Sequence, residues 1–443
     1  MQNNLQVMEN NGSRKLFLTT QMINGLIFNF ITTVISYQML DIKGSGFAFA
    51  SVWFVNSLPK ILFTMVGGFA ADFFDRKRLY ILIDIFGLLI ISIMFICGMS
   101  SNLSLYLYSF CFGLLKAFST PVTKSIVPLV SSKKKLLRTN SFEISNDKIA
   151  RTLGPVAVLF LIPLFGSRLI LSFSFVSYLT SIIMKYHIVL NPIDETQEND
   201  EQDSPKVTIF EGLSDLFTSS GIFLLFANAL ITQFIFHPLV STALPSILQK
   251  MKYNEDSTLM AFFIWLAALL GKNKKKVWMN LSAVINLGGA LGVLISFLYI
   301  VKVDKSKEKR GINLGVAGQI FFGLMVSITL YYYLIVGDLP LDSLVLILTI
   351  LNCGLYFSFN IFTIFFSMYY QREINKSSMG RFVGAMMVMF SLFYSAGSLI
   401  YGYAVDKNLH LSIGLLLTGI IAKAILHIFF IHNENRKEIV EEV

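Results

Sequence analysis

The sequence carries little charge for its length. Only 14% of its 443 residues are Asp, Glu, Lys or Arg, whereas 54% are hydrophobic and the mean hydropathy is +0.66. A soluble domain has about 25% charged residues, so this composition argues against a large soluble enzyme. The apolar runs reach about 20 residues, which is the length of a helix that crosses a bilayer. The chain is therefore predicted to be an all-α integral membrane protein.

Cysteine and histidine are also scarce, and neither forms a chemical motif. The cysteines, Cys97, Cys111 and Cys353, lie inside apolar runs and are interpreted as small core residues rather than as a disulfide or metal set. The five histidines are dispersed without metal-ligand spacing. The sequence also lacks a Gly-x-x-x-x-Gly-Lys-Ser/Thr phosphate loop, so ATP is not the expected energy source. We therefore expect no enzyme activity, no cofactor and no metal.

The net charge of +9 comes from basic residues in short loops between apolar runs. This distribution is typical of the cytoplasmic loops of membrane proteins, and it argues against a nucleic-acid partner. With both termini in the cytoplasm, the chain is predicted to be a multi-pass protein of a bacterial cell membrane. The basic clusters of the cytoplasmic loops lie at residues 76–78, 133–138, 305–310 and 372–381.

About twelve spans are predicted from length and flanking charge. The acid-rich polar segment 191–220 divides them into six and six. The predicted organisation is an N-terminal six-helix bundle over 1–190, a cytoplasmic linker over 191–220 and a C-terminal six-helix bundle over 221–443. The predicted spans are 16–40, 47–71, 79–99, 103–130, 140–165, 168–190, 221–248, 278–302, 312–336, 343–369, 380–404 and 410–432.

One segment of the C-terminal half does not fit this pattern. The apolar stretch 259–270 is too short to span a bilayer, and a lysine cluster follows it. If it did span, the basic cluster at 305–310 would fall outside the cell. We therefore interpret 255–276 as an extra interfacial or re-entrant element on the outer face. A structural cap and a gating or substrate-access element both remain open.

A charged loop follows the second apolar run. Residues 72–78 read Asp-Phe-Phe-Asp-Arg-Lys-Arg. The basic residues hold such a loop in the cytoplasm, and its carboxylates bind these cations or cap the next helix. The segment resembles the loop between the second and third helices of the major facilitator superfamily of secondary transporters, whose usual form is Gly-x-Leu-Ala-Asp-Arg-x-Gly-Arg-Lys. The matching residues are Gly68, Ala71, Asp72, Arg76 and Lys77.

Two positions of this loop depart from the usual form. Phe73 replaces an Arg, and Asp75 replaces a Gly. An Asp at the second position is common in the drug-efflux branch, which includes macrolide exporters. The resemblance implies that the loop latches the inward side of a transporter. Its candidate gating residues are Asp72, Asp75, Arg76 and Lys77.

Further motifs resemble the same efflux branch along nearly the whole chain. The segment from Gly380-Arg381 to Gly402 and Asp406 is similar to that branch's eleventh helix. The fifth-helix antiporter motif keeps Gly154-Pro155 but lacks the two glycines that usually follow. Other matches are Gly44-Ser45, Pro59 and Asn140.

The resemblance implies a monomeric, proton-driven exporter in which two bundles rock about a midplane site. The substrate would be a small organic molecule, either drug-like, as a macrolide is, or siderophore-like. Uptake of a small metabolite remains an alternative. So does a non-transporting membrane protein, such as an immunity or receptor subunit.

Ionisable residues inside predicted spans are costly there and are functional candidates. Glu143, Asp147 and Arg151 recur at four-residue steps on the fifth span, so they share a helix face. Asp84 and Lys124 lie at similar depth on the third and fourth spans. The three acids are candidate proton carriers. A solvated vestibule and a structural ion pair remain alternative interpretations of these residues.

A second set of candidates lies deeper. Lys60, Lys116 and His237 fall near the middle of their spans, where no acid lies at matching depth. Such cations would suit an anionic substrate, for example a carboxylate-bearing siderophore, or they could bind backbone carbonyls at nearby kinks. Polar amides avoid lipid, so the first span adds three cavity candidates. These are Gln21, Asn24 and Asn29.

The predicted eighth span is rich in glycine. It reads Leu-Gly-Gly-Ala-Leu-Gly over residues 287–292. Small residues let two helix backbones approach closely in a membrane. We expect these glycines to mark a tight helix contact rather than a ligand contact.

Overall fold

The computed structural model describes residues 11–131, 133–190, 219–250, 258–269, 278–302, 308–335, 337, 339–374 and 379–441, apart from some side chains within helices. Every regular element of this part of the chain is a helix. Eleven of the helices described there are long and apolar enough to cross a membrane, and the apolar part of α5 at 149–165 is shorter. The predicted all-α membrane fold is confirmed.

The chain forms two compact units. Unit 1 comprises Met1–Ile42 and Val52–Pro205, and unit 2 comprises Lys43–Ser51 and Lys206–Val443. The first residues of α2 therefore belong to unit 2, and the remainder of α2 belongs to unit 1. The helices of the first half are α1 (Asn11–Lys43), α2 (Gly46–Phe73), α3 (Arg76–Cys97), α4 (Asn102–Val130), α5 (Lys133–Phe165) and α6 (Ser167–Tyr186).

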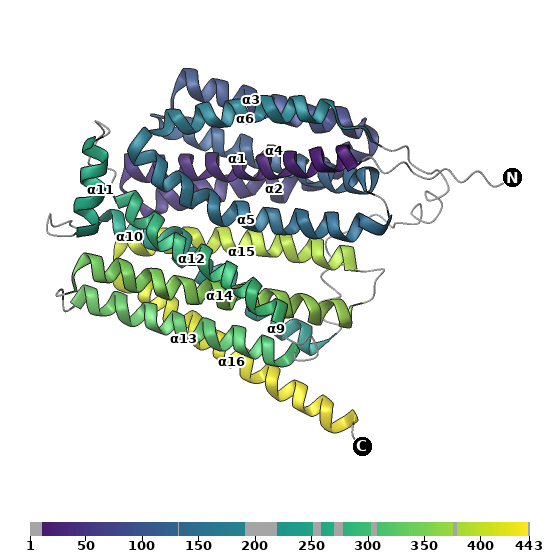
Figure 1. The fold of residues 1–443 in the computed structure, drawn as a ribbon. Coiled ribbons are helices and arrows are strands. Elements are labelled where there is room, and N and C mark those ends of the chain that lie inside the picture. The colour runs from purple at the N-terminus through teal and green to yellow at the C-terminus, as the bar shows by residue number, and fades with distance from the viewer. Residues whose placement is uncertain are drawn as a thin grey trace. The chain divides into compact units, whose positions relative to one another are not determined.

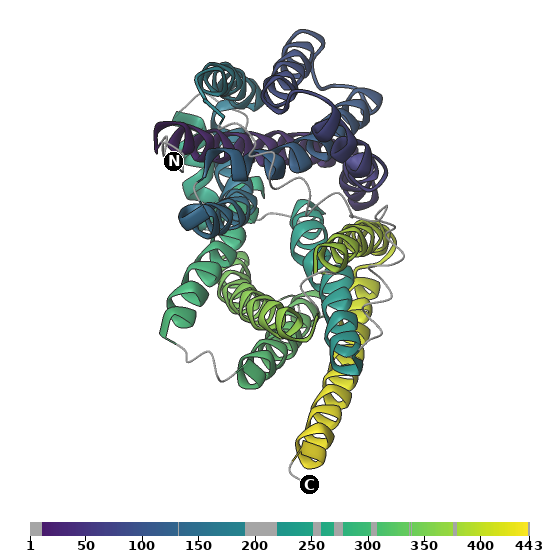
Figure 2. The ribbon, with the colours of Figure 1, turned by 90° about the vertical axis from the view of Figure 1, so that its right-hand side faces the viewer.

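Close helix contacts organise unit 1. At the crossing of α2 and α4, a Cβ on Gly113 would lie 2.2 Å from the backbone oxygen of Asn56, so only glycine fits there. The amide of Asn56 donates to the Ser109 carbonyl at 2.9 Å, and the Ser109 hydroxyl donates to the Val52 carbonyl at 2.8 Å. The helices α3 and α6 also lie side by side, as Figures 1 and 2 show. The site described below lies where α3 packs on α6.

Unit 2 contains the second set of helices. Its first span is continuous from 220 to 250 but includes two π-helical segments on either side of Pro238. Proline lacks a backbone N–H, so it interrupts the hydrogen-bond pattern of an α-helix, and π-helical turns flank it here. The elements are α9 (Ser220–Ile231), η3 (Thr232–Phe236), η4 (Leu239–Ala243), α10 (Leu244–Lys250), α11 (Thr258–Leu269), α12 (Trp278–Lys302), α13 (Glu308–Ile335), α14 (Leu341–Glu373), α15 (Met379–Lys407) and α16 (Leu409–Glu441).

The glycine-rich span predicted to pack tightly does so. A Cβ on Gly288 of α12 would lie 2.1 Å from the Thr349 carbonyl oxygen of α14, and one on Gly292 would lie 2.1 Å from the Cys353 oxygen. Neither position has room for a larger residue. The expectation of a close helix contact is confirmed. Helix α14 also packs on α13, so it lies between two neighbours (Figure 1).

The apolar stretch within 255–276 forms the short helix α11. The Asp342 carboxylate accepts hydrogen bonds from the backbone N–H groups of Thr258 at 2.7 Å and Leu259 at 3.3 Å, which caps the first turn. Phe262 and Trp265 are exposed on this helix. Residues 255–257 and 270–276 lie outside the described part of the chain. The role of the element stays a prediction.

Candidate functional site

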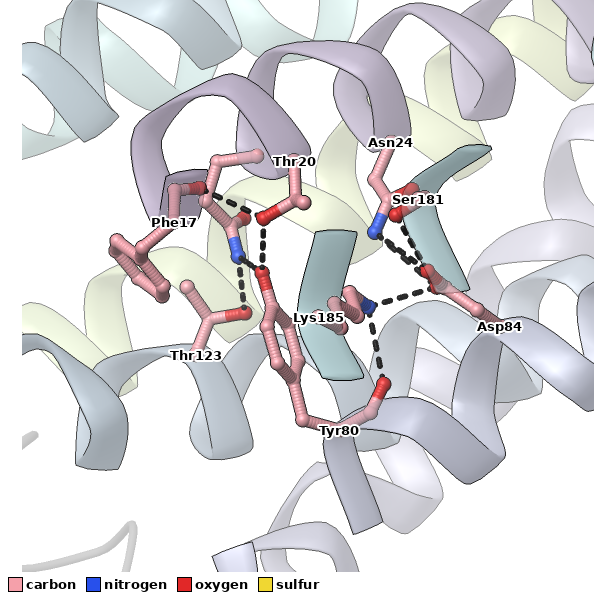
Figure 3. A network of polar contacts seen from close by, with 9 residues as sticks. Phe17, Thr20, Asn24, Tyr80, Asp84, Thr123, Ser181 and Lys185 are labelled. Atoms are coloured by element: carbon pink, nitrogen blue, oxygen red, sulfur yellow. Dashed lines mark hydrogen bonds and ion pairs between the residues drawn. The ribbon is translucent and has the colours of Figure 1, made fainter. Parts of the chain in front are cut away.

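The most elaborate polar site of unit 1 surrounds Asp84. This residue is 1% exposed, because the buried residues of α3 recur every three or four positions and Asp84 lies on that face. The ammonium of Lys185 lies 2.8 Å from Asp84 Oδ1. The Ser181 hydroxyl donates to Oδ2 at 2.6 Å, and the Asn24 amide donates to Oδ1 at 3.1 Å. Figure 3 shows these side chains converging from α1, α3 and α6.

Tyr80, one turn before Asp84, extends the network. Its backbone carbonyl accepts a hydrogen bond from Lys185 at 2.9 Å, and the ammonium of Lys185 lies 3.5 Å from the centre of its ring. The Tyr80 hydroxyl binds the Thr20 hydroxyl at 3.0 Å and the Gln21 amide. Gln21 also donates to the Thr123 hydroxyl of α4 at 3.2 Å. One connected network thus joins four helices of unit 1 (Figure 3).

This arrangement neutralises a charge that burial would otherwise penalise. Two charges that leave water are tolerated when they pair closely and when hydrogen bonds satisfy their remaining atoms. Lys185 is 1% exposed and binds both the carboxylate and a carbonyl. The geometry suits either a fixed ion pair or a carboxylate that changes protonation when the helices separate.

A second group of unit 1 combines Lys60 and Lys116, two of the predicted mid-span cations. Their ammonium groups lie 5.9 Å and 5.4 Å from the centre of the Phe28 ring. Lys60 also donates to the Asn56 side-chain oxygen at 3.0 Å. These residues come from α2, α4 and α1. Two positive charges therefore share one aromatic ring at partly buried positions.

The third predicted cation site, His237, belongs to unit 2. It lies between the π-helical segments η3 and η4, with its ring 4.8 Å from that of Phe359 and 6.3 Å from that of Tyr356. The structure thus places His237 among aromatic side chains of unit 2, whereas Lys60 and Lys116 lie in unit 1.

The predicted cavity amides have different surroundings. Gln21 and Asn24 belong to the Asp84 network. Asn29 donates to the Gly25 carbonyl of its own helix at 2.8 Å. The structure therefore gives each of these amides a protein partner.

The loop at residues 72–78 is held by local hydrogen bonds. Asp75 caps α3, accepting from the Arg78 backbone N–H at 2.7 Å. The Arg76 guanidinium donates to the Ala71 carbonyl at 3.3 Å, and the Lys77 ammonium lies 5.6 Å from the centre of the Tyr186 ring. The Asp72 side chain lies outside the described part. A capping role for a loop carboxylate matches the expectation from the sequence, and the latch function stays a prediction.

The remaining proton-carrier and ion-pair candidates stay predictions. The side chains of Glu143 and Asp147 on α5 lie outside the described part of the structure. Arg151 and Lys124 are exposed on α5 and α4. The described ion-pair partner of Asp84 is Lys185.

Sequence reasoning missed Lys185, Ser181 and Tyr80. Lys185 lies close to the end of the predicted span 168–190, and a lysine at such a place usually extends to the membrane surface. One signal was available. Ser181 and Lys185 are four residues apart on an apolar helix, so they form a polar stripe that must face a polar partner.

Two motif positions far apart in the sequence meet within unit 2. The Asp406 carboxylate accepts from the Ser45 hydroxyl at 2.6 Å and from the backbone N–H groups of Gly46 at 2.8 Å and Phe47 at 2.9 Å. The Lys250 ammonium lies 2.6 Å from the same carboxylate. Asp406 at the end of α15 therefore caps the start of α2.

The sequence matches the family model of the Major Facilitator Superfamily over residues 17–357. The chain belongs to this superfamily. It is a multi-pass membrane transporter and not an enzyme. No curated protein matches the sequence.

Solved transporters share the fold. The nucleoside transporter NupG has a TM-score of 0.63 at 14% identity, covering 95% of this chain and 98% of that one. A D-xylose-proton symporter has a TM-score of 0.65 at 11% identity, covering 93% and 97%. An inward-facing bacterial homologue of the iron transporter ferroportin has a TM-score of 0.59 at 16% identity, covering 95% and 98%. At these identities the likeness concerns the fold alone.

Proposed function

We propose that this transporter exports a small organic anion, siderophore-like or drug-like, in exchange for protons. The two six-helix halves would alternate in access as a monomer in a bacterial cell membrane, with both termini in the cytoplasm. The loop at 72–78 would latch the inward side. The efflux-branch motifs support the direction, and the residues below support the class of substrate.

The observation that carries the substrate class is the pair of lysines at Phe28. Two ammonium groups lie within 6 Å of one ring at partly buried positions, and like charges repel each other. A bound anion would offset this repulsion, and an apolar or aromatic body beside its charged group would pack on the Phe28 ring. A carboxylate or polycarboxylate molecule meets both requirements.

Proton coupling needs a group that changes protonation during transport. Asp84 is the described candidate, because its ion pair with Lys185 breaks if the carboxylate is protonated. Glu143 and Asp147 are further candidates on sequence grounds. Separation of α3 from α6 would remove the lysine from the carboxylate.

Metabolite profiling of a deletion strain tests the proposal. Strains lacking the gene are compared with strains complemented by the wild type, by Lys60→Gln, by Lys116→Gln or by the control Lys15→Gln, an exposed lysine at the start of α1. We expect an endogenous anion to accumulate inside the deletion strain and to return to the medium with the wild type and the control. Each mid-span substitution should lower that export at least about tenfold, because binding loses a charge-assisted contact.

Two results would contradict parts of this proposal. Depletion of the compound inside the deletion strain, with its recovery on complementation, would indicate uptake instead of export. Accumulation of an uncharged or cationic compound, with full export by Lys60→Gln and Lys116→Gln, would exclude the anion site.

A further inference from the structure

Unit 2 buries a second lysine, Lys423 of α16, which is 0% exposed. Its ammonium donates to the backbone carbonyl of Asn228 at 3.2 Å, to the side-chain oxygen of the same residue and to the Thr232 hydroxyl at 2.7 Å. An ammonium group has three hydrogens, so these three oxygens satisfy it fully. All three acceptors are neutral.

The surroundings of Lys423 contain no counter-charge within ion-pair distance in the part of the chain described. The rings of Phe236 and Phe362 lie 5.6 Å and 5.2 Å from the ammonium. Gln319 of α13 accepts a hydrogen bond from Thr232 at 3.1 Å. Neutral oxygens and aromatic faces therefore hold a positive charge inside an apolar core.

A second basic group lies one turn further along the same helix face. His427 is 8% exposed, and its ring stacks on Phe430 with centroids 6.1 Å apart. Its Nδ1 atom is buried and makes no hydrogen bond with any described residue. Residues four apart on a helix are neighbours, so a charge on Lys423 acts directly on His427.

The elements packed against α16 supply no other titratable group at this level among the described residues. Those elements are α9, η3, η4, α13 and α15, and α14 adds Phe362 beside the ammonium and Tyr369, whose hydroxyl binds Glu434. The side chains that bind the lysine from α9 and η3 are an amide and a hydroxyl, and Gln319 of α13 binds that hydroxyl. On α15, Tyr394 donates to Ser241, and Tyr401 is buried. On α13, residues 308–310 precede Gln319 by nine positions or more, which is at least about 13 Å along the axis.

The same face of α16 carries a third titratable residue closer to the C-terminal end of the helix. Glu434, seven residues after His427, is buried, accepts from the Tyr369 hydroxyl at 2.9 Å and lies 3.4 Å from the ammonium of Lys309. Lys423, His427 and Glu434 thus lie on one face of the helix. His427 and Glu434 are about 10 Å apart along the helix axis, so a proton passes between them only through water.

We propose that Lys423 and His427 form a proton-binding pair in unit 2 that binds and releases one proton in each transport cycle. The pair holds one positive charge, either on the Lys423 ammonium or on the His427 imidazole, and water carries the proton between them, because all three ammonium hydrogens are bound to oxygens of Asn228 and Thr232. The imidazolium then loses a proton to water on the side of Glu434. The pair rests on the proposed transport function and would supply a second proton-binding group in unit 2, beside Asp84 in unit 1.

The π-helix gives this pair a link to conformation. Thr232 begins η3 and supplies one of the three oxygens that hold the ammonium. Rewinding a π-segment into an α-helix rotates the helix on one side of the segment relative to the helix on the other, so Asn228 and Thr232 would move relative to the residues after η3. Such a change would withdraw an acceptor from Lys423 and favour transfer of its proton.

Histidine NMR on the full-length protein in detergent tests the pair without any substrate. The imidazole signal of His427 is assigned by its loss in His427→Gln and followed against pH in the wild type, in Lys423→Met and in the control Lys407→Met, an exposed lysine of α15. Removal of a charge one turn away should move the His427 titration midpoint by at least about one pH unit. The control should leave it unchanged.

A His427 midpoint that is the same in the wild type and in Lys423→Met would overturn the pair. If Lys423→Met does not fold, Lys423→Gln is used, because its amide still donates to Asn228, and the same expectations hold. The measurement needs no transport. If Lys423 changes the titration of His427 but no export is detected, the proposed function is wrong and the pair stands. If proton-driven export occurs and Lys423 does not change the titration of His427, the pair is wrong and the proposed function stands.

Discussion

Among the described residues, each half of the molecule buries a lysine from its last membrane helix, but the two lysines are compensated differently. Lys185 of α6 is paired with the Asp84 carboxylate. Lys423 of α16 binds the amide oxygen and carbonyl of Asn228 and the hydroxyl of Thr232. The first charge is neutralised within unit 1, and the second is only solvated within unit 2. A paired charge favours a fixed arrangement of helices, whereas an unpaired one can leave as a proton.

The comparison can be tested by exchanging the residue types that bind the two buried lysines. Asp84 and Asn228 both place a side-chain oxygen on a buried lysine, and Asp and Asn have nearly the same shape. Replacing each by the other changes the charge and little else. The expected effects follow, from the largest to the smallest.

Asp84→Asn should give the largest loss of stability. The substitution leaves Lys185 buried without a carboxylate partner, which is the situation of Lys423. Unlike Lys423, Lys185 would not have three neutral oxygens arranged around its ammonium. Breaking a buried pair from one side costs about 3–5 kcal/mol. Thermal unfolding of the purified protein in detergent measures it. The double variant Asp84→Asn with Lys185→Met is the control and should recover most of the loss; no recovery would mean that the carboxylate acts other than through Lys185.

Asn228→Asp should have the opposite sign and a smaller size. The new carboxylate would lie where the amide oxygen of Asn228 already contacts Lys423, creating in unit 2 the kind of pair that unit 1 has. We expect a stabilisation of about 1–2 kcal/mol, because part of the attraction is lost to desolvation of the carboxylate. Thermal unfolding again measures it. Transport should fall at the same time, since a fixed pair no longer gives up its proton. Full proton-driven export by Asn228→Asp would argue against the pair as the coupling group.

Tyr80→Phe should have the smallest effect. It removes the hydroxyl that binds Thr20 and Gln21 but keeps the ring beside Lys185. The loss of this hydrogen bonding corresponds to about 1 kcal/mol. Tyr403→Phe, at an exposed position of α15, is the matched control and should be neutral. A loss as large as that of Asp84→Asn would show that the hydroxyl, and not the ion pair, holds the network together.

The fold was accessible from the sequence because its main signals are local. Runs of about 20 apolar residues identify spans without any knowledge of their neighbours. The glycines at 288 and 292 predicted a tight contact, because only their lack of side chains had to be recognised. The π-helical segments on either side of Pro238 were not predicted, since their position depends on how the chain packs around the break.

The site was accessible only in part. Asp84 was marked by an acid inside an apolar span, but its partner Lys185 lies at the end of a span, where lysine is common. Lys423 and His427 lie in the middle of the predicted span 410–432, so the criterion that marked Asp84 applies to them as well. Their partners could not be assigned, because Asn228 lies 195 positions away in the sequence and the contact follows from tertiary packing.

Lysine NMR on one labelled sample tests the difference between the two halves most directly. The ammonium signals of Lys185 and Lys423 are assigned by substitution, and their pH titrations are compared in the wild type and in His427→Gln. The account predicts that His427→Gln moves the titration of Lys423 by at least about one pH unit and leaves that of Lys185 unchanged. An unchanged Lys423, or an equal response of both lysines, would contradict it.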